Sequence, residues 1–219
     1  QNMFSERTKI TEMDLSNFDT SNVIKMWRMF FNCVELTSIN LTNFNIPKAQ
    51  DIRGLFKNCK KLTSIDLSSF DTSKAILIQG MFDGCSSLIS INLSHFDTSN
   101  TKEIYELFIG CNNLEYIILP KFDENELTDI HDMFKNVPEN VVICMDKDNI
   151  EIILPQIKTK KCYTLDCSDD WISKQKKLNE DNECECNDFN YKMENDPLNT
   201  DDYFNCYQEI KGYYLDKKD

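Results

Sequence analysis

The stretch LTSIDLSSFDTSKAILIQGMFDGCSS, residues 62–87, is one unit of the repeat that decides the fold of this 219-residue chain. The next unit, residues 88–113, again carries Phe-Asp-Thr-Ser and Phe-x-x-Cys at the same positions. An internal period of this length means that one unit cannot bury its own apolar face, so neighbouring units must stack. The sequence therefore predicts a solenoid. Two phenylalanine ladders keep the 26-residue interval without an insertion: Phe18, Phe44, Phe70, Phe96 and Phe122, and Phe30, Phe56, Phe82, Phe108 and Phe134.

Each unit opens with the pattern Leu-x-x-Ile-x-Leu, as in residues 36–41. The alternation of Ile39 and Leu41 with polar residues predicts a short strand with these two side chains inward, as in a leucine-rich-repeat solenoid. Apolar residues then follow at helical spacing, as in Ala49, Ile52, Leu55, Phe56 and Cys59, and predict a short helix. Asp, Thr and Ser between strand and helix offer acceptors for the helix start. We therefore expect an α/β solenoid of short parallel strands and short helices.

The repeat pattern also predicts the organisation of the chain. Residues 1–10 form a partial repeat, five 26-residue repeats follow up to residue 145, residues 146–161 form a capping segment, and residues 162–219 are cysteine-rich and acidic. The fifth repeat departs from the pattern at Val137 and Pro138, as expected of a terminal repeat. Met3, Phe4 and Ile10 occupy repeat positions at the very start, so we expect either further repeats upstream or a partner that covers this end. The chain would then be part of a longer protein or assembly.

Net charge and hydropathy argue against a nucleic-acid partner and against insertion into a membrane. The formal net charge is −13, and the segment from Cys162 onward holds seven lysines against fifteen acidic residues. An acidic chain is a poor ligand for the phosphate backbone, so we expect no nucleic-acid partner. No run of 18 apolar residues is present, which predicts no membrane insertion in this segment.

The ten cysteines fall into two groups. Four occupy one repeat position on the buried helix face, and we expect buried free thiols there, with disulfides between stacked units as the alternative. The others lie mainly in the polar C-terminal segment, where we expect three disulfides of undetermined pairing, with zinc as the rival. The expected free thiols are Cys33, Cys59, Cys85 and Cys111, and the disulfide candidates are Cys144, Cys162, Cys167, Cys184, Cys186 and Cys206.

Outward positions supply the candidate binding residues. On the strand side the rows are polar until Tyr116 and Ile118, and apolar residues point outward on the helix side as well. These side chains predict a protein contact surface, with partial burial by neighbouring repeats as the alternative. The helix-side residues are Trp27, Phe31, Tyr105 and Ile109.

Asn40 and Asn92 each begin an N-glycosylation sequon on the predicted strand face, although the repeat produces a sequon wherever Asn is followed by Leu and Ser or Thr. His95 and His131 are the only histidines, and neither has a nucleophile in its own motif. We therefore expect no enzyme, no catalytic residues, no metal and no cofactor.

The repeat resembles a known family, the BspA-type leucine-rich repeats of bacterial and protist surface proteins. The residues that carry the resemblance are Leu15 to Val23, Gly80 to Leu88 and Ser94 to Asn100, and the likeness extends to about residue 145. It implies a cell-surface or secreted protein in adhesion or host interaction, and it implies no catalytic residues. We expect an extracellular module for protein recognition or adhesion. The alternative is a structural subunit that self-associates into a coat, fibre or filament.

Overall fold

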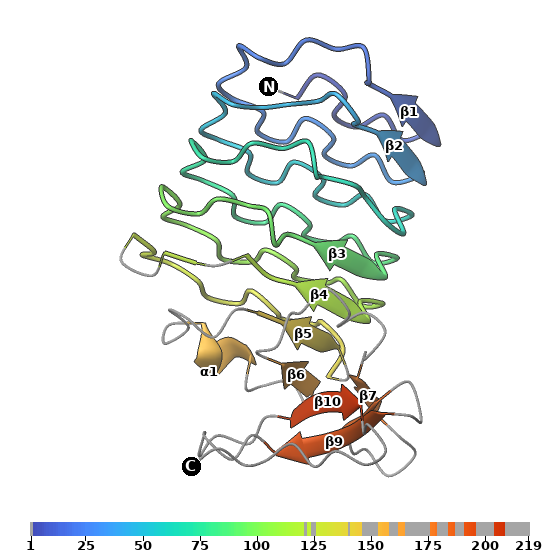
Figure 1. The fold of residues 1–219 in the computed structure, drawn as a ribbon. Coiled ribbons are helices and arrows are strands. Elements are labelled where there is room, and N and C mark those ends of the chain that lie inside the picture. The colour runs from blue at the N-terminus through green and yellow to red at the C-terminus, as the bar shows by residue number, and fades with distance from the viewer. Residues whose placement is uncertain are drawn as a thin grey trace.

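Successive 26-residue units form coils that lie one on the next in the computed structural model, with equivalent segments side by side (Figure 1). The structure describes residues 2–120, 122–123, 126–139, 141–145 and 153–157, and the backbone of strands at 162–164, 176–178, 184–186, 191–195 and 204–208. Short parallel strands in small sheets provide most of the regular structure. Within these residues the one helix is the four-residue α1 (Leu154–Ile157).

The strands pair in register, so that equivalent residues of neighbouring coils are direct partners. β1 (Glu12–Asp14) pairs with β2 (Ser38–Asn40), which places Met13 beside Ile39. A second parallel sheet contains β3 (Ser90–Asn92), β4 (Tyr116–Ile118), β5 (Val142–Cys144) and β6 (Cys162–Thr164) in chain order. The parallel ladder therefore continues to residue 164, beyond the last 26-residue unit.

The strand expected at residues 64–66 is not formed, and this gap separates the two parallel sheets. Ile65 there is half-buried, whereas its equivalents Ile91 and Ile117 are buried. Further along the chain, two antiparallel pairs follow. They are β7 (Lys176–Leu178) with β8 (Cys184–Cys186), and β9 (Tyr191–Asn195) with β10 (Phe204–Gln208).

The prediction of a short helix on the other side of each coil is wrong for the described residues. In residues 26–33 the amides alternate between two kinds of hydrogen bond. Phe31 N donates to Arg28 O at 3.2 Å in a tight turn, whereas Phe30 N donates to Leu55 O of the next coil at 2.9 Å. A helix would satisfy both amides within its own segment. Half of the backbone donors here are instead used to join coils, so the segment is a chain of turns.

Residues in the left-handed region explain this backbone. All twelve positive-φ residues of the described chain fall into two columns with the 26-residue spacing. A left-handed residue every fourth position reverses the peptide direction and stops helix growth. Glycine and asparagine, which adopt this region most readily, fill much of both columns. The columns are Asn2, Arg28, Gly54, Gly80, Glu106 and Asp132, and Glu6, Asn32, Asn58, Gly84, Gly110 and Asn136.

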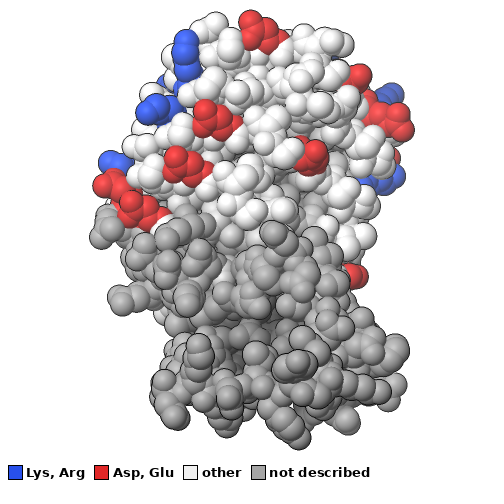
Figure 2. Space-filling model, in the orientation of Figure 1, with Lys and Arg blue, Asp and Glu red and all other residues white. Residues whose placement is uncertain are grey.

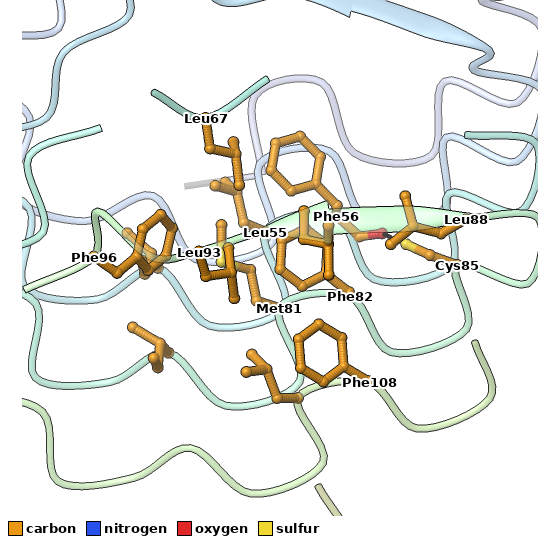
Figure 3. Close-up of a cluster of buried hydrophobic side chains, with 14 of the residues drawn as sticks. Leu55, Phe56, Leu67, Met81, Phe82, Cys85, Leu88, Leu93, Phe96 and Phe108 are labelled. Atoms are coloured by element: carbon orange, nitrogen blue, oxygen red, sulfur yellow. Dashed lines mark hydrogen bonds between the residues drawn. The ribbon is translucent and has the colours of Figure 1, made fainter. Parts of the chain in front are cut away.

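The core lies between the strand side and the turn side of the coils, and stacked phenylalanines run along it. Phe30 and Phe56 lie with ring centroids 5.2 Å apart and planes within 7° of each other, and Phe56 and Phe82 continue the stack at 6.0 Å. Figure 3 shows Phe56, Phe82 and Phe108 one above another, with Leu55 and Met81 near them. Offset aromatic stacking adds to the free energy of apolar burial. The two phenylalanine ladders of the sequence therefore are buried, except that Phe18 is 41% exposed.

The second left-handed column can be tested with a pair of glycine substitutions. A Cβ at Gly84 would lie 2.3 Å from Asn58 Oδ1, whereas a Cβ at Gly80 would meet its nearest atom at 3.8 Å. We expect Gly80→Ala to lower the free energy of unfolding by about 1 kcal/mol, the cost of a left-handed alanine. We expect Gly84→Ala to lower it by about 2–3 kcal/mol, because overpacking adds to that cost. Urea denaturation measures both values.

The added Asn58→Gly substitution serves as the control, because glycine accepts the positive φ at position 58 and removes the crowded side chain. In the Asn58→Gly background, Gly84→Ala should lower the free energy of unfolding only as much as Gly80→Ala does in the unmodified chain. Equal effects of the two single alanine substitutions would contradict the packing of Asn58 against Gly84.

Candidate interaction surfaces

The strand face consists of the outward residues of the parallel strands. Ser38 and Asn40 of β2 are exposed, as are the equivalent Ser90 and Asn92 of β3. The outward positions change in β4, where Tyr116 is half-buried and Ile118 is only 9% exposed. Of the two residues predicted for binding on this face, Tyr116 therefore presents the larger accessible part.

A local turn follows each exposed strand and is held by a side-chain oxygen. Asn40 Oδ1 accepts hydrogen bonds from Thr42 N at 3.1 Å and Thr42 Oγ1 at 2.7 Å. Asn92 Oδ1 accepts the same two bonds from Ser94 at 2.9 and 2.8 Å. Both sequon asparagines are thus exposed and held in the same turn, with their amide nitrogens directed away from these bonds.

Aspartates form the same turn elsewhere. Asp66 Oδ1 accepts a hydrogen bond from Ser68 N at 2.9 Å, and Asp71 Oδ1 accepts one from Ser73 N at 3.0 Å. Hydrogen bonds from the backbone and side chain of Ser68, and from the side chain and backbone of Ser73, hold the pKa values of these two carboxyl groups below the ordinary value of 3.8. The Asp-Thr-Ser motif therefore stabilises a turn, where a helix cap was expected. Its threonine is buried and joins coils: Thr72 Oγ1 donates to Asp97 O at 3.1 Å.

The turn face is the second surface, which we define as residues 25, 27, 28 and 31 and their equivalents at intervals of 26. Its N-terminal part contains an aromatic and cationic cluster. The Arg28 guanidinium lies 5.1 Å from the Trp27 ring centre and 4.9 Å from that of Phe31. Arg53 of the next coil lies 5.8 Å from the Trp27 ring and is held by a bidentate pair with Asp51, in which both bonds are 2.8 Å long. Such cation–π contacts stabilise partly exposed aromatic side chains.

The C-terminal part of the turn face also stacks planar groups. The rings of Tyr105 and His131 lie 4.7 Å apart with planes 9° from parallel. Asp129 Oδ1 lies 2.5 Å from His131 Nδ1, and this hydrogen bond raises the pKa of His131 above its ordinary value of 6.5. All four residues predicted for binding on this side, Trp27, Phe31, Tyr105 and Ile109, are half-buried on one face. Tyr116 and Ile118 belong to the strand face, so the predicted binding residues form two separate groups.

The arginines of the turn face were missed by the sequence analysis. In a helix, residues 27, 28 and 31 would also lie on one side, so what the sequence pattern did not show is the contact of the two arginines with the Trp27 ring. The available signal was the recurrence of glycine and asparagine at 26-residue intervals, which marks left-handed turns.

The four cysteines of the repeat are free, buried and equivalent in their contacts. Each thiol donates to the carbonyl oxygen of a phenylalanine in the preceding coil, as in Cys85 Sγ to Phe56 O at 3.1 Å. Cys59 Sγ and Cys111 Sγ make the same contact at 3.2 and 3.1 Å. These thiols therefore join coils as well as fill the core. Burial raises the pKa of Cys111 to about 12 and that of Cys85 well above 9.0.

Of the disulfide candidates, Cys144 is buried and disulfide-bonded. The side chains of Cys162, Cys167, Cys184, Cys186 and Cys206 lie outside the described residues. No group of three or more His, Cys, Asp or Glu residues suited to a metal ion occurs in the part of the chain that the structure describes. Among the same residues, no helix has the length and apolar character needed to cross a membrane.

Charged side chains of both signs are spread over the coils. On the face shown in Figure 2, basic side chains lie at the left and right edges, and acidic side chains lie at the top, across the middle and at both edges. Several charges are paired between neighbouring coils, including Lys61 with Glu35 at 2.6 Å and Lys57 with Asp83. The 26-residue spacing therefore places these charged side chains next to their partners.

One protein-family model matches the repeat region. Its description is "Mycoplasma protein of unknown function, DUF285", and it matches residues 1–88 and 33–142. The two matches overlap, as expected when one model spans several similar repeats. No curated protein and no solved structure matches the chain.

The buried thiols give a chemical test of the coil packing. We expect iodoacetamide at pH 8 to leave Cys59, Cys85 and Cys111 unmodified in the folded protein, because the thiolate is the reactive form and burial disfavours it. The same residues should react fully in urea. Peptide mass spectrometry measures the modification at each position, and rapid labelling of Cys85 in the folded protein would contradict the buried ladder.

The histidine of the turn face gives a pH test. We expect NMR titration to place the pKa of His131 above 6.5, and Asp129→Asn to bring it back toward that value. Because the folded-state pKa is raised, the stabilisation from this contact is complete below the unfolded pKa and is lost as the pH rises through the folded pKa. Glu126→Gln, which removes an exposed carboxylate elsewhere, is the control. An unchanged pKa in Asp129→Asn would show that the contact is not formed in solution.

Proposed function

We propose that this chain, which belongs to the family of Mycoplasma proteins of unknown function called DUF285, is a cell-surface or secreted module that recognises a protein partner or mediates adhesion. The observation that carries the proposal is the set of half-buried aromatic side chains at outward positions, held by coils that are joined through their backbones. Tyrosine and tryptophan on a rigid frame offer contact area at little entropic cost. The role requires no catalysis, metal or cofactor.

The finer description of the fold belongs to the same proposal. The stacked coils are a leucine-rich-repeat solenoid of the BspA type, and the segment beyond residue 145 is a cap stapled by disulfides. Support comes from the parallel pairing of Ile91 with Ile117 and of Ile117 with Ile143, and from the disulfide at Cys144. Disulfides are typical of exported proteins, so the cysteine-rich cap favours an extracellular location. Asn40 and Asn92 are exposed, and we propose them as glycan sites if the protein passes through a glycosylating secretory route.

A structural subunit of a coat, fibre or filament is the alternative. Exposed apolar side chains favour it, because Met3 is 58%, Phe18 41% and Ile24 50% exposed, and such a patch can be covered by another copy. Heterologous contacts that do not close into a ring give open filaments. Electron microscopy of the native protein separates the two roles, since a recognition module stays discrete.

The recognition role is tested by binding of the purified, labelled chain to the native cell surface. Tyr116→Ala tests the strand face and Trp27→Ala tests the turn face, and Ser90→Ala, at an exposed strand-face position without an aromatic ring, is the control. We expect the substitution on the face that contacts the partner to weaken binding by about tenfold or more, because aromatic anchors contribute much of the binding energy of an interface. Equal binding by all three variants and the unmodified chain would refute the assignment of these two surfaces. Unfolding curves of each variant confirm that the fold is retained.

A further inference from the structure

The charges of the turn face are distributed unevenly along the stack. From residue 25 onward, the turn segments 25–31 and 51–57 are positive in sum, and the segments 77–83, 103–109 and 129–135 are negative in sum. The net charge of the face therefore changes sign along the stack, although Arg53, Lys57 and Lys135 are each paired with an aspartate of the same chain. Its cations in the first half are Lys25, Arg28, Arg53 and Lys57, beside Asp51, and the charges of the second half are Asp83, Glu103, Glu106, Asp129 and Asp132, beside Lys135.

In the middle of the turn face, Asp83 is paired with Lys57 of the preceding coil. Gly54 and Gly80 place no side chain there, Leu77 is half-buried, and Gln79 is only 6% exposed. Gln79 Nε2 donates to Glu103 Oε2 at 2.9 Å, while Gln79 Oε1 has no hydrogen-bond partner among the described residues. Aromatic and apolar side chains lie on either side of this centre, at Trp27 and Phe31 and at Tyr105 and Ile109. The face thus has two apolar patches, one in the part with net positive charge and one in the part with net negative charge.

We propose that the turn face binds the turn face of a second copy of this chain, with the two stacks antiparallel. A two-fold axis in the plane of contact, running across the stack at residues 77–83, reverses the order of the coils and keeps each column opposite itself. Residues 25–31 then meet residues 129–135 of the partner, and residues 51–57 meet residues 103–109. The same patch serves both copies, as in any isologous dimer.

Charge selects this arrangement over the other two-fold pairing. A two-fold axis parallel to the stack would place each coil against its own copy, so that the positive halves would meet each other and the negative halves would also meet. The antiparallel pair instead places Lys25 opposite Asp129, Arg28 opposite Asp132 and Arg53 opposite Tyr105. It also places Asp51 opposite Glu103 and Asp83 opposite its own copy, and both aspartates are already paired within their own chain, with Arg53 and Lys57. Complementary charge across an interface favours the correct partner and penalises like-charge pairings.

The size of the surface sets the expected strength. Five coils at about 4.8 Å spacing give a face roughly 20 Å long, which is at the small end for a specific interface. We therefore expect a weak, reversible dimer that dissociates at high salt, since exposed charges are screened over about 8 Å at physiological ionic strength. The inference rests on the proposed function, and it names a second copy of the chain as the partner of the turn face.

The closing experiment is sedimentation velocity of the purified chain over a concentration series, with charge-reversal variants. Arg28 and Asp132 occupy the same left-handed column, in which Arg28 has a φ of 52° and Glu106 a φ of 57°, so that column accepts both signs of charge. We expect a monomer–dimer equilibrium that Arg28→Glu weakens by about tenfold or more, and that Asp132→Arg weakens similarly. The double variant should restore the dimer, because residues 28 and 132 of opposite copies then exchange roles.

Lys9→Glu is the matched control, since it reverses an exposed charge beside β1 and should leave the dimer unchanged. A chain that stays monomeric at every concentration would overturn the proposal. A dimer that Arg28→Glu does not weaken, or that the double variant fails to restore, would overturn the antiparallel arrangement. Sedimentation involves no other partner, so it tests the dimer separately from the proposed recognition function. The chain can be monomeric and still bind the cell surface through Tyr116, or it can form the dimer and not bind the cell surface.

Discussion

The backbone hydrogen bonds between coils on the turn side are the constraint on which the rest of the structure depends. Arg28, Phe30 and Asn32 each donate to a carbonyl of the next coil at 2.9 Å, and the equivalent residues repeat the pattern along the stack. One inserted residue would shift these donors by one position and direct the wrong side chains inward. Because the bonds use every second amide, they also force the alternating turns of this segment. The unbroken 26-residue interval is therefore a requirement of the backbone as much as of the core.

The core could be predicted from the sequence in considerable detail, but the backbone of the turn side could not be read from the same pattern. Apolar residues at positions 26, 29, 30 and 33 have the spacing of a helix, and they are indeed buried. Side-chain spacing reports which residues face the core, and it does not report where the amides find their acceptors. In one isolated unit a helix is the obvious solution. In a stack, the carbonyls of the next coil supply a second solution, and Asn32, Gly54 and Gly80 favour it.

For a related reason, the sequence indicates which residues lie on the candidate surfaces but not what they contact there or how exposed they are. Outward aromatic residues could be singled out from the sequence because they break the polar pattern of their columns, and the structure places them, half-buried, on two separate faces. Their surroundings depended on turns that the sequence analysis replaced with helices, so the contacts of Arg28 and Arg53 with Trp27 were not foreseen. At the strand face, Ile118 is almost buried although its equivalents Asn40 and Asn92 are exposed. Alternation along a strand places Ile118 outward, and only the structure shows how much of it remains accessible.

A stack in strict register turns differences between repeats into gradients along a surface. Each column of the turn face is one repeat position sampled five or six times, so the change from Arg28 to Glu106 and Asp132 in one column becomes a change of potential along one line. A single domain without repeats needs long-range contacts to place such residues in order, whereas here the order follows from the chain alone. The interior columns stay nearly constant because every coil must fit its neighbours. The outward columns are free of that constraint, and for this reason they are where a repeat protein can encode the orientation of its partner.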